Sequence, residues 1–368
     1  MRINSIRLVR VSMKLKYPFR TAFGNDEAIE SVLVQLISRD SYGWGESACW
    51  QAPAYCPECA ATQFIISRDF IAPRLLNKDI PTGEELQNLL EGIKGNYFAK
   101  AAFDLSWWDL FAKQKKLPLW KILGGKSNVV DAGADFGVMD NLSQLTDVIL
   151  EANKQGYKRI KLKYRPGWEI EMLKYVRSKF PDTVFHIDCN SCYSLKDLTM
   201  FKEIDTYGLA MIEQPLSHDD LIDHAELQRH LKTPICLDES IVTIDKVRKA
   251  IQIGACRWVN IKLGRVGGIT NALKINKLCE EKGIPCWVGS MADSAIGASH
   301  NIAFSTLSNI KYPCDIFPTS RFYKQDLGIP ELVHSAPSQF KASSASGIGT
   351  EVDEQLLKEI SIEQTVIK

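Results

Sequence analysis

The stretch RIKLKY, residues 159–164, is typical of a β-strand that sends charged and apolar side chains to opposite faces. Alternate residues of a strand share a face, so Lys161 and Lys163 point to one side and the apolar residues between and beside them point to the other. If the apolar face packs against helices, two ammonium groups enter an enclosed interior, where an unpaired charge is very costly. We therefore expect these two lysines to have a function.

Short apolar segments like this one recur along the chain, separated by amphipathic helical patterns. Each gap is long enough for a helix that connects two parallel strands, as in residues 219–231 and 269–283. Eight such units predict an α/β fold with a closed parallel barrel. The predicted strands span residues 130–137, 158–164, 183–188, 209–213, 234–238, 258–262, 285–289 and 312–317.

A polar residue stands at the carboxyl end of five consecutive predicted strands. Lys163, Asp188, Glu213, Asp238 and Lys262 follow one another at intervals of 25, 25, 25 and 24 residues. The carboxyl ends of barrel strands form one face, so we expect these side chains to meet at one mouth. Three carboxylates without Cys or His suit a hard cation such as Mg²⁺. Any one acid alone could cap a helix or pair with an arginine, but the shared spacing favours a metal site.

The lysines on either side of the carboxylates indicate proton transfer. A free lysine has a pKa of about 10.4, so almost none of it can act as a base near neutral pH. A neighbouring ammonium and a divalent cation both lower that pKa, and Lys161 beside Lys163 is interpreted as a tuning charge. A cation flanked by two lysines is suited to removing a proton α to a carboxylate. Lysine bases with Mg²⁺ are the pattern of the enolase superfamily.

Composition and charge exclude other classes of partner. The 368 residues carry a formal net charge of +1. The chain therefore lacks the excess of positive charge that is typical of proteins that bind nucleic acid or an anionic membrane. The N-terminal residues scatter Arg and Lys among apolar positions, and no later window holds 18 uncharged apolar residues. We expect a cytoplasmic homo-oligomer that binds a small-molecule carboxylate substrate.

Ten cysteines include two C-x-x-C pairs, Cys56/Cys59 and Cys189/Cys192, a spacing that also occurs in zinc sites. The two pairs are 133 residues apart, and no histidine completes a compact site. We expect reduced, mostly buried thiols instead.

Several motifs together resemble the muconate-lactonizing subgroup of the enolase superfamily, and within it the o-succinylbenzoate synthases and N-succinylamino acid racemases. The resemblance covers nearly the whole chain. It implies a modified TIM barrel, (β/α)7β, over residues 126–325, and an α+β capping domain built from residues 1–125 and the C-terminal segment 326–368. The motifs are RIKLKYRPGWEIE, HIDCNSCYSLKD, LAMIEQPLSHDDLIDHAELQ, TPICLDESI, VNIKLGRVGGITNAL, AAFDLSWWDLFAKQKKLPLWKILGG, PFRTAFG, SRFYKQD and GIGTEVD.

The resemblance also implies roles for individual residues. Mg²⁺, with Mn²⁺ as a substitute, would be bound by Asp188, Glu213 and Asp238. Lys163 would be the acid and base on one face of the substrate, adjusted by Lys161, and Lys262 would act on the opposite face. The residues that would support these groups from beside them are Asn190, Glu239 and Arg265. Arg265 is equally well explained as one partner of a salt bridge at the barrel top. The capping loop 18–24, with Arg20 and Phe23, would close over the substrate.

Two differences from the family pattern fall where the substrate is expected. The seventh strand usually continues as Gly-Gly-Met-x-Glu-x-Gly, and here residues 289–295 read GSMADSA. The added Cβ of Ser290 narrows a place where the backbone approaches the substrate. Asp135 replaces a small polar residue on the first strand and would repel a carboxylate or attract an ammonium. Asp135, Ser290, Met291 and Asp293 are therefore the expected substrate-binding residues of the barrel.

The reaction implied is abstraction of the α-proton of a carboxylate substrate. The first expectation is o-succinylbenzoate synthase activity, the dehydration of 2-succinyl-6-hydroxy-2,4-cyclohexadiene-1-carboxylate in menaquinone synthesis. The alternatives are an N-succinyl- or N-acylamino acid racemase, a dipeptide epimerase and a muconate-type cycloisomerase. A catalytically silent binding protein on the same barrel is disfavoured, because every predicted lysine and metal ligand is present.

Overall fold

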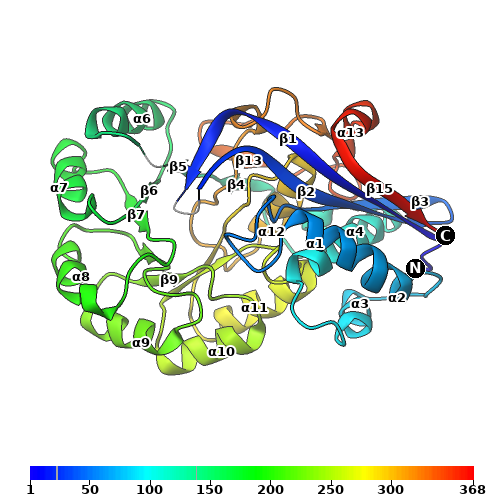
Figure 1. Ribbon diagram of the computed structural model, residues 1–368, viewed down its shortest axis with the longest axis horizontal. Coiled ribbons are helices and arrows are strands. Elements are labelled where there is room, and N and C mark those ends of the chain that lie inside the picture. Colours follow the sequence, from blue (N-terminus) through cyan, green and yellow to red (C-terminus); the bar gives the residue numbers. More distant parts are fainter. Residues whose placement is uncertain (22–23, 138) are drawn as a thin grey trace.

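The computed structural model describes residues 1–21, 24–137 and 139–368, and the side chains of residues 19–25 lie outside that description. It contains an antiparallel sheet and a parallel barrel, with the barrel helices arranged around the left and lower part of Figure 1. This arrangement confirms the predicted α/β fold with a modified TIM barrel. Within the described residues, no helix has both the length and the apolar character needed to cross a membrane.

Seven parallel strands form the barrel sheet in the order β11-β10-β9-β8-β7-β6-β5. Lys163 pairs with Asp188, and Asp188 pairs with Glu213, so polar residues of adjacent strands lie at one level. The strands are β5 (Ala134–Phe136), β6 (Ile160–Lys163), β7 (Phe185–Asp188), β8 (Ile212–Glu213), β9 (Ile235–Leu237), β10 (Trp258–Ile261) and β11 (Cys286–Val288). The helices between and after them are α6 (Leu142–Lys154), α7 (Glu169–Lys179), η2 (Leu195–Asp197), α8 (Leu198–Ile204), α9 (Leu221–His230), α10 (Ile244–Ile253), α11 (Ile269–Glu281) and α12 (Ala295–Ser305).

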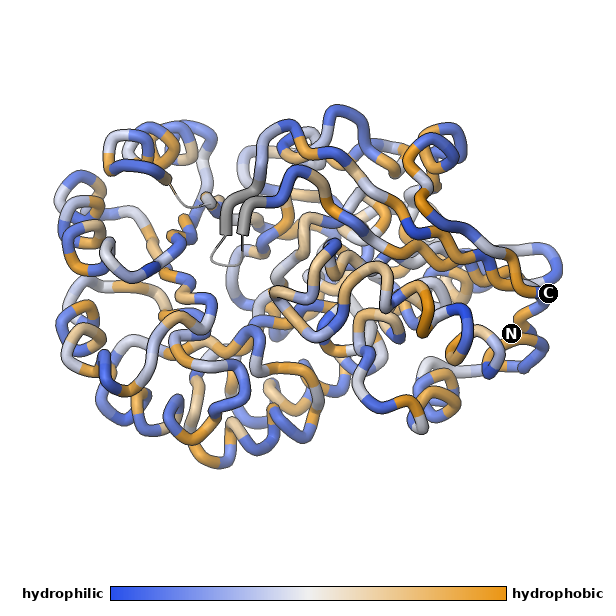
Figure 2. The backbone as a smooth tube through the Cα atoms, viewed as in Figure 1, coloured by the Kyte–Doolittle hydropathy of each residue, from blue (hydrophilic) through white to orange (hydrophobic). Residues whose placement is uncertain are grey.

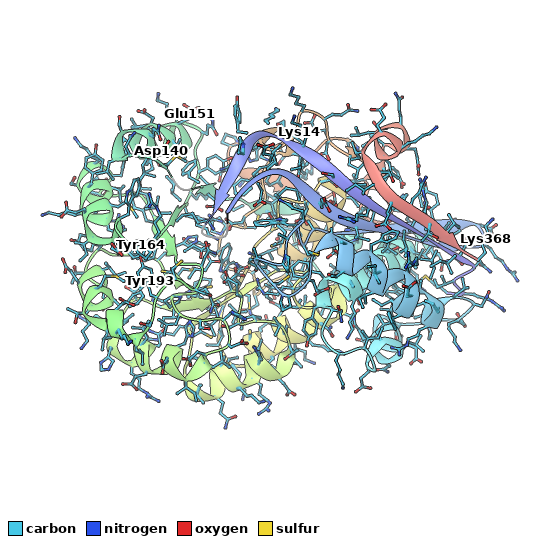
Figure 3. All side chains as sticks on the ribbon, viewed as in Figure 1. Lys14, Asp140, Glu151, Tyr164, Tyr193 and Lys368 are labelled. Carbon is cyan, nitrogen blue, oxygen red and sulfur yellow. The ribbon has the colours of Figure 1, made fainter. Side chains whose placement is uncertain are left out.

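Strand β6 shows how the sequence alternation becomes a barrel wall. Ile160 and Leu162 are fully or almost fully buried, and Tyr164, the next residue on the same face, packs beside Tyr193 with ring centres 5.8 Å apart (Figure 3). The Tyr164 hydroxyl also contacts Met200 of α8, so this face looks toward the helices. The barrel helices alternate between hydrophilic and hydrophobic along their turns (Figure 2), as one-sided burial requires. The two lysines of β6 therefore point into the barrel.

Two of the eight predicted strands differ in the structure. Residues 130–137 divide into β4 (Val129–Asp131), which pairs with β13 (Gln339–Lys341), and β5, which starts the barrel. Residues 312–317 form no regular strand, because Pro313 lacks the N–H of a continuous ladder. This segment still closes the ring: Asp315 N donates to Val288 O at 2.9 Å, and Gly133 N donates to Cys314 O at 2.9 Å.

The antiparallel sheet joins both ends of the chain in the order β15-β1-β2-β3. Strand β15 pairs with β1, so the two termini lie close together at the right of Figure 1. The N-terminal elements are β1 (Ser5–Thr21), β2 (Gly24–Ser38), β3 (Ser41–Ser47), α1 (Ala60–Ile66), η1 (Ser67–Ile71), α2 (Ala72–Leu75), α3 (Gly83–Leu90), α4 (Tyr97–Gln114) and α5 (Leu119–Ile122). The C-terminal elements are η3 (Thr319–Arg321), β12 (Gly328–Ile329), β14 (Glu351–Val352), α13 (Glu354–Ile360) and β15 (Ser361–Ile367).

Helix α4 connects the sheet to the barrel. A Cβ on Gly43 of β3 would lie 2.2 Å from Ser106 O, so only glycine permits this approach. Elsewhere α4 contacts α11 of the barrel, where Trp108 Nε1 donates to Thr270 Oγ1 at 2.9 Å. The position of the sheet over the barrel is thus fixed by a buried helix.

The ten cysteines are free thiols, and most of them are buried. Of the two C-x-x-C pairs, Cys59 and Cys189 are buried, Cys56 is half-buried and Cys192 is exposed.

Candidate active site

Lys161 lies at the centre of an ion-pair cluster inside the barrel. Its Nζ is 3.0 Å from Asp188 Oδ2, 2.9 Å from Glu213 Oε2 and 3.1 Å from Asp315 Oδ2. Burial alone lowers the pKa of a lysine, but these carboxylates outweigh burial and raise the pKa of Lys161 well above its ordinary value. Lys161 is therefore a charged ammonium.

Lys163 lies two residues further along β6 and is more accessible. Its Nζ donates to Asp188 Oδ2 at 2.8 Å and to Asn190 Oδ1 at 3.1 Å. Burial lowers the pKa of Lys163, Asp188 raises it and Lys161 lowers it, and the net result is a raised pKa. Lys161 acts in the direction expected of a tuning charge, but among these protein groups it does not outweigh Asp188.

Asp188, Glu213 and Asp238 end or follow three adjacent strands, and each is at most 1% exposed. Burial raises the pKa of each carboxyl group. For Asp188 and Asp238 the neighbouring lysine and arginine cations outweigh burial, so both pKa values are lowered. The pKa of Glu213 is raised to about 7, because burial and the charge of Asp188 both oppose its ionisation. The three acids therefore do not ionise equally.

This set of oxygen atoms fits a hard divalent cation. Glu213 Oε2 is buried and receives no hydrogen bond of good geometry, although Lys161 Nζ is 2.9 Å away. Asn260 Nδ2 donates to the other oxygen of this carboxyl group, Glu213 Oε1, at 2.8 Å. As placed, the carboxylates contact lysines and an arginine, and in the described part of the chain no three His, Cys, Asp or Glu side chains converge into a group that could hold a metal. Metal binding would require some of these ion pairs to open.

Lys262 directly follows β10 and lies on the other side of the carboxylates. Its Nζ is 3.0 Å from Asp238 Oδ2 and donates to Tyr55 Oη at 3.1 Å. Arg265 donates to the same tyrosine oxygen at 2.7 Å and forms an ion pair with Asp238. Burial lowers the pKa of Lys262, but Asp238 outweighs burial and the pKa is raised. The structure thus places Arg265 in direct contact with the groups around Lys262.

Asn190 and Glu239 connect two of the carboxylate strands. Asn190 Nδ2 donates to Asp188 Oδ2 and to Glu239 Oε1, both at 3.2 Å. Burial and Asp238 raise the pKa of Glu239 to about 8. Both residues lie beside the predicted ligands, as the sequence implied.

One cavity brings the two sides together. It is lined by Lys163 and Lys262 and by the substrate-binding candidates Asp135, Ser290 and Met291. The loop between β3 and α1, residues 48–59, adds Trp50 and Tyr55 to the cavity wall. The chain after the eighth strand position adds Phe317, Arg321 and Phe322. Of the predicted capping residues, Arg20 and Phe23 have side chains outside the described residues.

Asp293 does not line this cavity. Its carboxylate accepts hydrogen bonds from Met291 N at 3.3 Å and Asn301 Nδ2 at 3.0 Å. It lines a separate cavity together with Glu46 of β3, Ser290 and Met291. The structure therefore gives Asp293 a position that supports the loop after β11.

Three contacting residues were not predicted from the sequence. Asp315 stands at the end of the eighth strand position and pairs with Lys161 and Arg159, but it breaks the regular spacing. The feature of the sequence that could have identified Asp315 is its position near the end of a predicted strand. Tyr55 comes from a loop of the capping part, and Arg321 follows the barrel, so no strand periodicity indicates them.

Comparison with known proteins places this geometry in a family. Residues 3–124 match the family model "Mandelate racemase / muconate lactonizing enzyme, N-terminal domain", and residues 144–356 match "Enolase C-terminal domain-like". The chain is 42% identical to an o-succinylbenzoate synthase from Geobacillus stearothermophilus, over 95% of this chain and 94% of that one. It is 36% identical to an N-succinylamino acid racemase from Thermus thermophilus, over 99% and 98% of the two chains.

A solved structure agrees with these matches. A member of the enolase superfamily from Listeria innocua superimposes with a TM-score of 0.96 and 35% identity, covering 100% of this chain and 99% of that chain. The chain is an enzyme of the enolase superfamily and belongs to its muconate-lactonizing subgroup.

Proposed function

We propose that the protein is an o-succinylbenzoate synthase. It would convert 2-succinyl-6-hydroxy-2,4-cyclohexadiene-1-carboxylate into o-succinylbenzoate and water, in menaquinone synthesis. The observation that carries the proposal is the 42% identity with such a synthase over 95% of the chain. The position of Lys163 and Lys262 in one cavity supports it.

Lys163 would do the proton transfer on one face of the substrate. In its neutral form it would take the proton from the carbon that bears the carboxylate. The same ammonium would then return a proton to the hydroxyl that leaves as water, so that the elimination is syn. Lys163 must lose its ion pair with Asp188 to act first as a base, because that pair raises its pKa.

Lys262 would stay protonated and stabilise the negative charge from the opposite face. Its contacts with Asp238 and Tyr55 hold the ammonium at the cavity wall. Asp188, Glu213 and Asp238 would hold Mg²⁺, which enolase superfamily members generally bind, or Mn²⁺ in its place. Such a cation supplies electrostatic stabilisation of the enolate charge on the substrate carboxylate.

The direct test is incubation of the protein with the cyclohexadiene substrate and Mg²⁺, with o-succinylbenzoate measured by its ultraviolet absorbance. We expect stoichiometric dehydration that EDTA abolishes. Absence of product at micromolar enzyme would overturn the assignment.

A second candidate function is racemisation of an N-succinylamino acid. It is favoured by the 36% identity with an N-succinylamino acid racemase and by the contact network of Arg265 around Lys262. Racemisation uses the two lysines on opposite faces and needs no leaving group. Proton NMR in D₂O distinguishes the two: exchange of the α-proton of N-succinylamino acids at a rate above that of dehydration favours the racemase.

We also expect a homo-oligomer in the cytoplasm. Light scattering after size-exclusion chromatography tests the first expectation, and cell fractionation tests the second.

A further inference from the structure

Arg321 is a half-buried cation whose guanidinium makes no salt bridge with any described residue. Its Nη2 donates to the main-chain oxygen of Asp135, and in the described residues it forms no salt bridge. Its guanidinium lies over the ring of Phe317, 4.2 Å from the ring centre, with Phe136 and Phe322 at 5.7 and 5.6 Å. Aromatic faces fix the plane of a guanidinium but leave its N–H edges unused. The remaining donors of Arg321 are therefore available to a ligand.

Among the described residues, the carboxyl group of Asp135 likewise has no ion-pair partner. Its Oδ1 is buried and receives no hydrogen bond, and the structure shows no salt bridge from Asp135 to any described cation. Asp135 and Arg321 interact through space but are not in contact through their charged atoms. Buried charges are normally paired, and a pair that merely held the fold together would bond directly.

Both groups line the cavity that contains Lys163 and Lys262. A substrate in this cavity would meet a positive group at Arg321 and a negative group at Asp135. An anionic end would be attracted to the first and repelled by the second, so the two charges specify which way the substrate lies. The proposed function assigns Lys163 and Lys262 to the reacting carbon, and Arg321 is a further cation of the cavity wall that could bind a second carboxylate.

We propose that Arg321 binds the substrate carboxylate that is remote from the reacting carbon, the carboxylate of a succinyl group. This inference rests on the proposed function, because the names of both kinds of relative, o-succinylbenzoate synthase and N-succinylamino acid racemase, share that group. Asp135 directs the anionic tail toward Arg321 by repelling it from the neighbouring wall. The guanidinium would bind the tail through two parallel N–H donors.

The test compares two ligands that differ only at the tail. Calorimetry at pH 8 with Mg²⁺ measures binding of o-succinylbenzoate and of 2-butanoylbenzoate, in which a methyl group replaces the remote carboxylate. A charge-assisted hydrogen bond predicts that the wild type prefers o-succinylbenzoate by roughly 10- to 100-fold. Arg321→Met, which keeps the packing on Phe317, should reduce this ratio to about 1. Asp135→Asn should increase it by roughly 2- to 5-fold, because it removes a like charge.

The control variant is Lys16→Met. Lys16 Nζ donates to Ser320 O at 2.5 Å, so it holds the same segment from outside the cavity. Lys16→Met should keep the wild-type ligand ratio. Arg321→Lys should retain part of the preference, because the charge remains and the paired donors are lost.

The outcomes separate this inference from the proposed function. A ratio that is unchanged in Arg321→Met, a wild-type ratio near 1, or a wild type that binds neither ligand overturns the role of Arg321, even if dehydration is observed. A ratio that depends on Arg321 in a protein that dehydrates nothing supports the carboxylate site and overturns the synthase assignment. Opposite shifts in Arg321→Met and Asp135→Asn support the orienting role, which a purely structural pair would not produce.

Discussion

The molecule holds two clusters of buried carboxyl groups and accommodates them in opposite ways. At the barrel mouth, Lys161 alone contacts three carboxylates at 2.9–3.1 Å, and Asp188, Asp238 and Asp315 each pair with a further lysine or arginine. Between the sheet and the barrel, Glu46 and Asp293 form no salt bridge with any described residue. Glu46 instead accepts hydrogen bonds from Ser294 N at 3.1 Å and Gly297 N at 3.0 Å, at the start of α12.

The carboxyl groups at the mouth are paired with cations, whereas Glu46 and Asp293 are held by hydrogen bonds where the sheet packs on the barrel. Paired charges at the mouth can exchange partners when a ligand arrives, because each group keeps an ionised neighbour. The acids at the domain contact retain protons more readily: burial and mutual repulsion raise the pKa of Glu46 to about 7, and burial raises that of Asp293 to about 6. Glu46 joins β3 to the start of α12 through these hydrogen bonds. Four variants test this difference between the two clusters.

The largest expected effect is on catalysis at the mouth. Lys163→Met should lower kcat for dehydration by about 10⁴-fold, since the variant loses both the base and the acid of the reaction. Steady-state kinetics measures the loss, and circular dichroism checks that the fold remains. Lys158→Met is the matched control, because Lys158 is exposed and forms an ion pair with Asp131 at the surface; it should stay within twofold of wild type. A Lys163→Met enzyme within tenfold of wild type would exclude the proposed role.

The next effect is on stability. Lys161→Met leaves Asp188, Glu213 and Asp315 without their shared cation and should cost about 3–5 kcal/mol of unfolding free energy. Urea denaturation in EDTA measures this, and added Mg²⁺ should restore part of it by binding the native state. Lys246→Met removes only an exposed ion pair with Asp219 and should cost about 0.5 kcal/mol. A loss below about 1 kcal/mol for Lys161→Met would show that the mouth does not depend on its central charge.

The domain contact should respond to pH in the opposite sense from a salt bridge. The pKa of Glu46 rises from 4.5 to about 7 on folding, so between these values the native state holds more protons than the unfolded chain. Its contribution to stability is therefore lost as the pH rises from about 4.5 to 7. Glu46→Gln removes this dependence, so relative to wild type the variant should gain on the order of 2 kcal/mol between pH 5 and pH 8. Urea denaturation at both pH values tests this, with the exposed Glu171→Gln as a control that should change nothing.

The same comparison explains which parts of the site could be predicted from the sequence. The groups at the mouth follow strand ends, and strands of equal spacing in one parallel register bring their ends together; Lys163, Asp188 and Glu213 pair residue by residue. Alternation along RIKLKY predicts the direction of its lysines, because a strand fixes the direction of every side chain. The site residues that could be predicted from the sequence are therefore those at the ends of regular strands.

Residues outside regular backbone were placed less well. Asp293 lies outside the cavity lined by Lys163 and Lys262, and Ala292 before it has φ 60°, a turn that strand alternation does not describe. Tyr55 reaches Lys262 across 207 positions of sequence, and no local pattern encodes such a contact. Asp315 follows Pro313, where the eighth strand is interrupted, so the spacing that located the other acids does not extend to it.

The smallest effect is expected in the loop of residues 48–59, which contributes Tyr55 to the cavity at the barrel mouth. Tyr55→Phe removes an oxygen that accepts hydrogen bonds from Lys262 and Arg265 but keeps the ring, whose centre is 4.7 Å from Lys262 Nζ. Both cations retain Asp238 as a partner, so the loss should be that of a single shared acceptor, about 2- to 10-fold in kcat/KM. Tyr17→Phe, at an exposed position of β1, should leave kcat/KM unchanged. A loss above 100-fold for Tyr55→Phe would mean that the hydroxyl itself transfers a proton, and the paired lysines would then no longer account for the chemistry of the mouth.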